Sequence, residues 1–214
     1  VVGGRHLDAI SDQTERAALV QRACDACTAG LVRTGFVHAD PPEGNLMLAE
    51  DGRVIFLDFG LMATVEPTIM EAFATGIQAC LSGDYEALTK VFQDVGFVGT
   101  PIQNRDGVGQ PYRDATLPEL AAAVRGAMEE CEGGTARFGA LATVLNGLSK
   151  QWRMFTPPYV VLLIRTFLTL EGIAAKVDPD FNIYEISMPW AVKRSLSPQS
   201  AEGVAALRAA LLTR

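Results

Sequence analysis

Apolar residues recur at helical spacing along most of the chain. Near the N-terminus, this spacing predicts a helix that begins after Ser11, a candidate N-cap, and ends at Gly35, which suits the left-handed position after a helix. The apolar positions of that helix are Val20, Ala23, Cys27 and Leu31. Beyond Pro67, a residue favoured in a first helical turn, we expect helices interrupted by a loop rich in Gly, Pro and Asn over 97–116. These helices cover residues 67–82, 85–96, 117–131, 137–150, 158–175, 183–195 and 200–212.

One short region breaks the helical period. Residues 36–37 are apolar and extended, and the loop HADPPEGN follows over 38–45. After the loop, two apolar runs flank a Glu-Asp-Gly turn, which predicts a β-hairpin over 46–57 that leads directly to Asp58. The predicted fold class is therefore α+β, mainly α, with one small hairpin in a helical body.

The composition is that of one folded domain or a large part of one. A chain of 214 residues can bury one sizeable core, and 49% hydrophobic with 20% charged residues argues against disorder. The net charge is −7 and Lys and Arg are not clustered. Because phosphate contacts need such clusters, we expect no nucleic acid as a partner.

Two features resemble a membrane span and a metal site, and each has a simpler interpretation. Arg165 and Glu171 interrupt the apolar stretch 156–175, so its uncharged runs are far shorter than the ~18 residues that a span needs. We expect a buried core helix there, with a membrane-facing role as the alternative. Cys24 and Cys27 have CxxC spacing, but they lie in a helical pattern without a second pair nearby, which favours core packing and a reducing compartment.

Three polar side chains, Asp40, Asn45 and Asp58, have a spacing that suits phosphoryl transfer. Four residues separate Asp40 from Asn45, and Asp58 follows thirteen residues after Asn45. The intervening hairpin can fold back and bring the three side chains to one place. Phosphoryl transfer needs a carboxylate at the nucleophile and oxygen ligands that hold Mg²⁺ against the phosphates, and Asp and Asn can supply both.

This pattern matches the protein-kinase signature, in which H-x-D-x-x-x-x-N precedes D-F-G. Among kinase-like folds, the chain most resembles the UbiB family of atypical kinases, which is linked to coenzyme Q and prenylquinone metabolism. GFVHADPPEGNLML resembles the family pattern GFFHADPHPGNLLV, and VIFLDFGLMATV resembles the following strand and DFG. PPYVVLLIRTFLTLEGIAAKVDPDFNIYE is similar to the family's C-terminal region, above all in plastid members. Together the matches run from about residue 1 to 195.

The resemblance implies an atypical kinase or ATPase that uses Mg-ATP and serves prenylquinone or other isoprenoid-lipid metabolism. By position, it implies Asp40 as the catalytic-loop aspartate, a base or substrate-orienting group. It implies Asn45 and Asp58 as Mg²⁺ ligands and His38 as a structural residue that holds the loop backbone. The implied partners are ATP and lipid or prenylquinone intermediates, or a membrane surface. The resemblance favours a plastid location, with mitochondrial or bacterial membranes as alternatives.

The resemblance also implies that the chain is the C-terminal lobe of a kinase-like fold. In this interpretation one domain covers 1–214. Residues 1–4 are a hinge remnant formed by a strand end and a Gly-Gly bend. Residues 36–60 form the catalytic loop, hairpin and DFG, and residues 67–212 form the helical body. A phosphate-binding loop, a strand lysine and the family's K-x-G-Q motif are not found in the sequence. We therefore expect the N-terminal lobe to be absent from this chain, and the chain alone to bind ATP poorly and turn it over negligibly.

Departures from the family pattern leave other functions open. Pro42 and Glu43 replace a His and a Pro, so no cation stands where ordinary protein kinases place a lysine, and one stabiliser of transition-state charge is missing. The alternative is a catalytically weak, nucleotide-sensing or lipid-binding scaffold. Only residues 61–66 separate DFG from the next helix, which leaves no room for a peptide-docking segment and favours a small or lipid-linked substrate. An aminoglycoside-type phosphotransferase shares the loop pattern, but LDFG argues against it.

Overall fold

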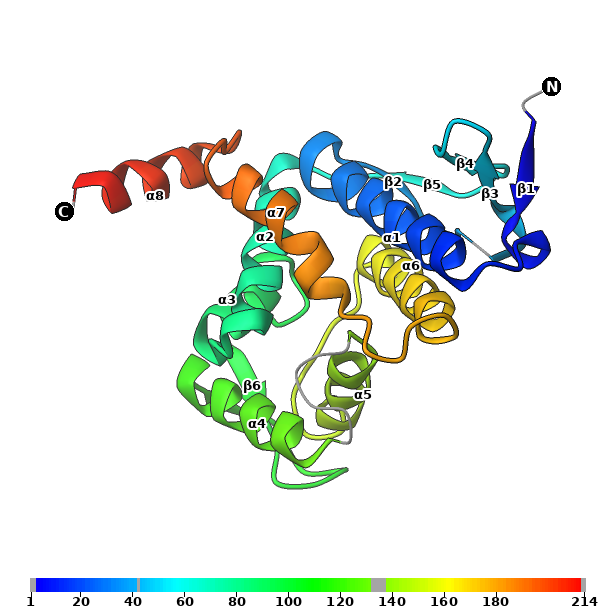
Figure 1. Cartoon of the computed structure of the whole chain (residues 1–214). Helices are drawn as coiled ribbons and strands as arrows, with labels where there is room; N and C mark the ends of the chain where they lie inside the picture. Colours follow the sequence, from blue (N-terminus) through cyan, green and yellow to red (C-terminus); the bar gives the residue numbers. More distant parts are fainter. Residues whose placement is uncertain (1–2, 42, 132–137, 213–214) are drawn as a thin grey trace.

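A computed structural model describes residues 3–41, 43–131 and 138–212. The protein is mainly helical, as predicted, and has small antiparallel sheets where a single hairpin was expected (Figure 1). The α-helices are α1 (Gln13–Ala29), α2 (Pro67–Ser82), α3 (Tyr85–Asp94), α4 (Leu117–Glu130), α5 (Phe138–Leu148), α6 (Pro158–Ala175), α7 (Ile183–Ser195) and α8 (Ala201–Leu212). The strands are β1 (Gly4–His6), β2 (Phe36–His38), β3 (Leu46–Ala49), β4 (Val54–Phe56), β5 (Met62–Thr64), β6 (Ile102–Asn104) and β7 (Arg113–Ala115). Short 3₁₀ turns cover Leu7–Ala9 and Glu43–Asn45, and a π-helical turn covers Gly30–Thr34.

Local chemistry at the helix ends explains most of the boundaries. The predicted cap at Ser11 is wrong by one residue, because the Asp12 side chain accepts the hydrogen bond from the Glu15 N–H that starts α1. Asp84 caps α3 by the same kind of bond. Gly35 follows the π-helical turn with φ 70°, and an added Cβ would lie 2.5 Å from the Val65 carbonyl oxygen, so only glycine fits there.

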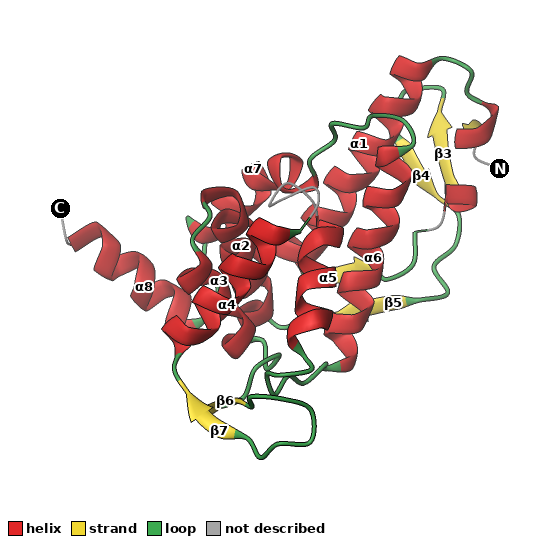
Figure 2. Cartoon of the chain, turned by 90° about the horizontal axis from the view of Figure 1, so that it is seen from below, coloured by secondary structure: helices red, strands yellow, loops and turns green. Residues whose placement is uncertain are grey.

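The predicted hairpin forms, and shorter strands extend the sheets. β3 and β4 pair antiparallel, with Leu46 opposite Phe56. The predicted Gly-Gly bend is not found in the described part of the N-terminus, because Gly4 already belongs to β1, which pairs with β3; residues 1–2 of the expected hinge remnant lie outside the described residues. β2 pairs with β5, and β6 pairs with β7 within the expected loop over 97–116 (Figure 2). These extra strands have three residues each, too few for a sequence pattern to reveal them.

Helix α6 joins the two hydrophobic clusters of the core. One cluster packs α1, α2, α6 and α7 around the hairpin base, and the other packs α2 to α6. Helix α6 is long and apolar enough to cross a membrane by length and composition. Leu163 and Leu170 are fully buried in the first cluster, and Val160 is buried in the second. One side of α6 therefore packs in the core, whereas Val161 and Leu168 on the same helix are exposed.

The CxxC pair lies inside the same core. Cys24 and Cys27 are buried free thiols on α1. Burial raises the pKa of Cys27 to about 12 and raises that of Cys24 as well. At neutral pH both are therefore protonated thiols that pack as small apolar groups.

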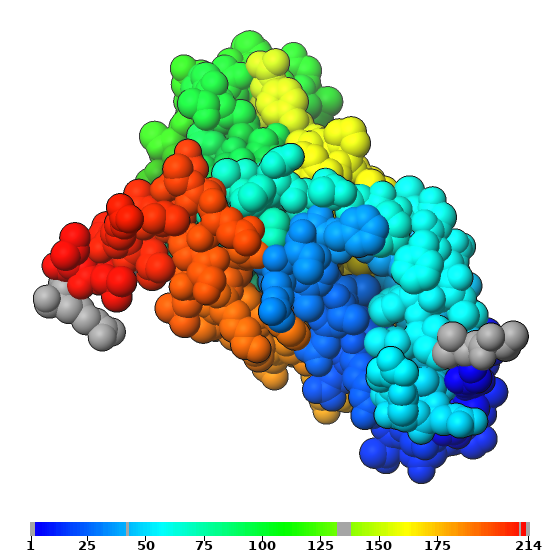
Figure 3. Space-filling view, turned by 90° about the horizontal axis from the view of Figure 1, so that it is seen from above, coloured from blue at the N-terminus to red at the C-terminus, as the bar shows by residue number. Residues whose placement is uncertain are grey.

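Helix α8 projects from the body at the end opposite the N-terminal strands (Figure 3). Glu71 of α2 anchors its start by accepting hydrogen bonds from the N–H groups of Gln199 (2.6 Å) and Ser200 (2.9 Å) and from the Ser200 hydroxyl. Partial burial acts to raise the pKa of Glu71, but these hydrogen bonds outweigh it and hold the pKa below its usual 4.5.

Because the Glu71 carboxylate holds the start of α8, we expect the packing of α8 against the body to depend on pH. A carboxylate whose folded-state pKa is depressed stabilises the fold above its unfolded pKa, and that stability is lost as the pH falls through the folded value. We expect the hydrogen-exchange protection factors of α8 to be constant above the usual pKa of 4.5 and to decrease below it. Glu71→Gln should remove this dependence, whereas the exposed Glu202→Gln should retain it. A Glu71→Gln profile that matches the wild type would contradict the assignment.

Candidate functional site

The pairing of β2 with β5 places the HADPPEGN loop beside the segment that carries Asp58. His38 lies opposite Met62 in this pairing, and the Ala39 N–H donates to the Leu61 carbonyl oxygen at 2.9 Å. Val37 and Ala39 are buried, so the start of the loop is fixed in the core. The two halves of the predicted site, separated in sequence by the hairpin, therefore lie side by side.

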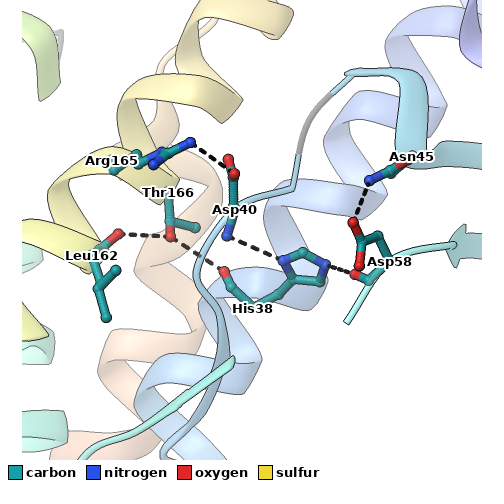
Figure 4. Close-up of polar contacts among 7 residues, drawn as sticks. All are labelled: His38, Asp40, Asn45, Asp58, Leu162, Arg165 and Thr166. Carbon is teal, nitrogen blue, oxygen red and sulfur yellow. Dashed lines mark hydrogen bonds and ion pairs between the residues drawn. The ribbon is translucent and has the colours of Figure 1, made fainter. Parts of the chain in front are cut away.

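His38 connects the two halves through both ring nitrogens (Figure 4). Its Nδ1 accepts a hydrogen bond from the Asp40 N–H at 3.3 Å, and its Nε2 contacts the Asp58 carbonyl oxygen. A carbonyl can only accept and an N–H can only donate, so the ring is the neutral tautomer with its proton on Nε2. The Thr166 hydroxyl on α6 donates to the His38 carbonyl oxygen at 3.2 Å. With both nitrogens occupied, His38 orders the backbone and has no free nitrogen for proton transfer.

Asn45 and Asp58 face each other at the open end of the hairpin. Asn45 Nδ2 lies 3.5 Å from Asp58 Oδ2, and the Gly60 N–H donates to Asp58 Oδ1 at 2.8 Å. The Leu57 N–H donates to the Asn45 carbonyl oxygen at 3.0 Å, which ties the two backbones together. Asp58 is exposed and Asn45 is half-buried, so solvent and ligands can reach the pair.

The Asp40 carboxylate turns away from that pair and toward helix α6 (Figure 4). Its Oδ2 lies 2.8 Å from Nη2 of Arg165, and the two side chains are 32% and 58% exposed. The structure thus places Asn45 and Asp58 in contact, whereas Asp40 is linked to Asp58 through His38 and the backbone.

Two cations next to the loop, Arg165 and Lys176, were not predicted from the sequence to have a role in the site. Lys176, at the end of α6, forms an ion pair with Glu43. Pro42, which stands where the family pattern has a histidine and ordinary protein kinases have a lysine, lies outside the described residues. Two positive charges from α6 therefore stand near a loop that supplies none itself. The only signal in the sequence was that Arg165 interrupts an otherwise apolar run.

The oxygen atoms of Asn45 and Asp58 fit a magnesium ion that is shared with a phosphate ligand. Among the described residues, no group of three or more His, Cys, Asp or Glu side chains converges on one point. Such a group is needed by a metal held by protein alone, but Mg²⁺ usually takes one or two protein oxygens and completes its octahedron with water and phosphates. Asn45 would bind through Oδ1, which requires its amide to turn from Asp58.

Two family models match the chain. The ABC1 atypical kinase-like domain matches residues 2–92, and the UbiB helical domain matches residues 135–182. An uncharacterized protein of Synechocystis sp. is 31% identical over 175 residues, 80% of this chain and 29% of the relative. In Arabidopsis thaliana, an uncharacterized chloroplastic aarF domain-containing protein kinase is 28% identical over 80% of this chain and 23% of its own length. The chloroplastic protein ACTIVITY OF BC1 COMPLEX KINASE 3 is 29% identical over 78% and 22%. The chain thus spans about a quarter of the length of the curated relatives it matches.

Proposed function

Because the chain belongs to the UbiB family of ABC1-type atypical kinase-like proteins, we propose that it carries the metal site and catalytic loop of an enzyme that uses Mg-ATP. The observation that carries this proposal is the contact between Asn45 and Asp58 beside the His38-ordered loop. One exposed and one half-buried side chain, both bearing oxygen, are held side by side by backbone hydrogen bonds and would form part of a coordination shell that phosphates and water complete. Bound Mg²⁺ would neutralise charge that develops on the transferred phosphoryl group.

In this proposal, Asp40 accepts the proton of the attacking hydroxyl or water, or orients that nucleophile. Arg165 fixes the direction of the Asp40 carboxylate through their 2.8 Å ion pair. An ion pair this exposed is worth little in stability, at most about 1 kcal/mol, so its main value is to position the groups. Arg165 also supplies a cation near the loop, where the Pro42 position supplies none.

We further propose that the whole domain over 1–214 is the C-terminal lobe of a kinase-like fold. The hinge would lie at 1–4, the catalytic loop, hairpin and DFG at 36–60, and the helical body at 67–212. Exposed apolar side chains next to Asp58 support this assignment: Leu57, Phe59 and Leu61 are 48%, 62% and 37% exposed. An exposed apolar patch of this kind is typical of an interaction surface, and the nucleotide-binding lobe is the partner that this site needs.

The substrate class is proposed from the family. A plastid location agrees with the chloroplastic and cyanobacterial relatives. A role with prenylquinone or other isoprenoid lipids at a membrane surface is proposed from the family alone. The short connection between Gly60 and α2, which contains only β5 and its flanks, supports a small or lipid-linked substrate over a peptide.

A nucleotide-sensing scaffold is the second candidate function. The observation in its favour is that the Asp40 carboxylate pairs with Arg165 and points away from the side chains of Asn45 and Asp58. A scaffold of this kind binds Mg-ATP without turning it over, so nucleotide binding and ATP hydrolysis must be measured separately.

The Asp40–Arg165 pair gives the test of the proposed activity. In the full-length protein, we expect Asp40→Asn and Arg165→Met each to lower Mg-dependent ATP turnover by on the order of 10- to 100-fold, with smaller effects on ATP affinity. Because the two residues act as one unit, the double variant should lose little more than Asp40→Asn alone. Arg208→Met, an exposed arginine on α8, is the matched control and should retain full turnover.

The two functions give opposite results in this experiment. Mg-dependent ATP binding with no turnover by the wild-type protein would reject the enzyme and favour the scaffold. Additive losses in the double variant would show that Arg165 acts independently of Asp40.

A further inference from the structure

A pocket of about 480 Å³ lies at the surface between the π-helical turn and the end of α7. These two elements are far apart in sequence and pack side by side (Figures 1 and 3). The pocket is lined by Arg33 of the turn, by Trp190, Lys193 and Arg194 of α7, and by polar residues that follow α7. None of its described lining residues belongs to the candidate metal site, and its volume is typical of small-molecule sites.

The charge of this pocket is opposite to that of the chain. The chain has 25 acidic and 18 basic residues, yet the described lining residues include Arg33, Lys193 and Arg194 and no Asp or Glu. The side chains of Arg33 and Lys193 are exposed, so a ligand can reach both. In the described part of the chain, neither of these two charged groups forms an ion pair or donates a hydrogen bond. The fold thus brings two unpaired cations to one pocket.

Arg194 has a structural role and adds its charge from below. It is 6% exposed, and its guanidinium donates to the carbonyl oxygens of Val32, Arg33 (2.6 Å) and Ser197 (3.3 Å). A cation in the last turn of a helix is favourable, and Arg194 meets that need for α7. Carbonyl oxygens that would repel an anion are therefore occupied by this guanidinium, which leaves Arg33 and Lys193 to face the pocket.

Trp190 forms an apolar wall that also orients Lys193. The Lys193 Nζ atom lies 4.6 Å from the centroid of the indole ring, a cation–π contact that holds the ammonium group at the pocket. The indole Nε1 donates to Asp25 at 3.2 Å, which fixes the ring. Asp25 and Glu71, which holds the start of α8, each contact residues of the wall, but both already accept hydrogen bonds and neither lines the pocket.

These donors and charges define the ligand. Besides the two cations, the pocket offers the Ser197 hydroxyl and the Gln199 amide, which form no side-chain hydrogen bond with described residues. A phosphate monoester carries a charge of about −2 and three acceptor oxygens, and an arginine fork can bind two of these oxygens at once. The pocket also leaves room for an organic group beside Trp190. We propose that it binds a phosphate monoester, carried by a soluble molecule or by a lipid headgroup.

Fluorine NMR of the full-length protein labelled with fluorotryptophan tests this proposal. Trp190 reports on the pocket, and its resonance is the one lost in Trp190→Phe; Trp152, buried in the second hydrophobic cluster, is the reference. Without ATP or Mg²⁺, phenyl phosphate should move the Trp190 resonance saturably and leave that of Trp152 in place. Phenyl sulfate has nearly the same shape but one negative charge fewer, so near neutral pH it should bind at least about fivefold more weakly.

Single-charge variants show whether the binding uses this pocket. Arg33→Gln should weaken the binding of phenyl phosphate about tenfold, and Lys193→Gln about threefold to tenfold, because each removes a charge-assisted contact. Both side chains are exposed, so both variants should fold. Arg208→Gln removes the same charge from α8, outside the pocket, and should bind as the wild type does. Equal binding of the phosphate and the sulfate, or equal affinity in Arg33→Gln and Arg208→Gln, would overturn the proposed site for phenyl phosphate.

Vesicles identify the source of the phosphate group. Phosphatidic acid has a phosphate-monoester headgroup, and phosphatidylcholine vesicles with and without it are sedimented with the protein. Sedimentation with phosphatidic acid that Arg33→Gln lowers would assign a lipid headgroup. Binding of phenyl phosphate, with sedimentation that Arg33→Gln leaves unchanged, would assign a soluble monoester. If Arg33→Gln changes neither measurement, the proposal is wrong. ATP is absent throughout, so the outcome is independent of the proposed kinase activity.

Discussion

Replacing Asp58 with asparagine in the full-length protein is expected to lower Mg-dependent ATP turnover about 1,000-fold, or about 4 kcal/mol of transition-state stabilisation. Asp58 contributes the only negative charge of the Asn45–Asp58 pair, and a neutral amide is a much weaker Mg²⁺ ligand. The variant should still fold, since an asparagine Oδ1 can accept the Gly60 N–H bond that orients residue 58. The loss should therefore appear in Mg-ATP binding and turnover, with little change in thermal stability.

Asp51→Asn is the matched control for this prediction. Asp51 lies in the turn at the other end of the same hairpin, where it is exposed and pairs with Arg53. Its replacement removes the same charge from the same hairpin without touching the Asn45–Asp58 pair, so turnover should stay within about twofold of the wild type. Equal losses in the two variants would show that Asp58 acts through hairpin stability or net charge and not as a ligand.

The second large effect is expected on stability, from Glu171→Gln. Glu171 on α6 is 9% exposed and accepts hydrogen bonds from the N–H groups of Phe138 (2.6 Å) and Gly139 (2.7 Å) at the start of α5. A hydrogen bond to a charged group contributes about 1.5–3 kcal/mol, and a carboxylate also suits the positive end of a helix. Glutamine offers one oxygen for two donors and leaves one N–H unpaired. We expect the free energy of unfolding to fall by about 3 kcal/mol in denaturant titrations.

Glu130→Gln separates this specific effect from the loss of a negative charge. Glu130 is exposed in the last turn of α4, where a negative charge opposes the helix dipole, so the change should be within about 0.5 kcal/mol of zero. A Glu171→Gln variant that is as stable as this control would contradict the proposed role of Glu171 at α5.

The elements that were predicted well are those with long, periodic patterns. Helices α6 and α7 begin and end where the apolar spacing predicts, and the hairpin forms around its Glu-Asp-Gly turn. The strands β5, β6 and β7 were missed because three residues carry no period, and β5 owes its pairing to β2, which lies far away in sequence. The cap of α1 was displaced by one residue because Ser11 and Asp12 are both good caps and only the geometry selects between them.

In the site too, the contact made within one hairpin was predictable from the sequence, whereas the contact made by a residue far along the chain was not. The spacing of Asn45 and Asp58 around a hairpin predicts their approach, because the hairpin itself brings them together. The direction of the Asp40 carboxylate depends on Arg165, which comes 125 residues later in the chain. In the sequence, Arg165 and Glu171 only mark interruptions of an apolar helix. In the structure, these two charges fix the loop and the start of α5, respectively.

We propose that Asn45 and Asp58 hold the metal of a nucleotide complex, and iron-directed cleavage tests this role most directly. Fe²⁺ replaces Mg²⁺ in the full-length protein with ATP, and ascorbate with peroxide then cleaves the backbone next to the bound metal. Mass spectrometry of the fragments should locate ATP-dependent cuts beside Asn45 and beside Asp58, in the wild type and in Asp51→Asn but not in Asp58→Asn. Cuts elsewhere in the protein, or the same cuts in Asp58→Asn, would contradict the claim.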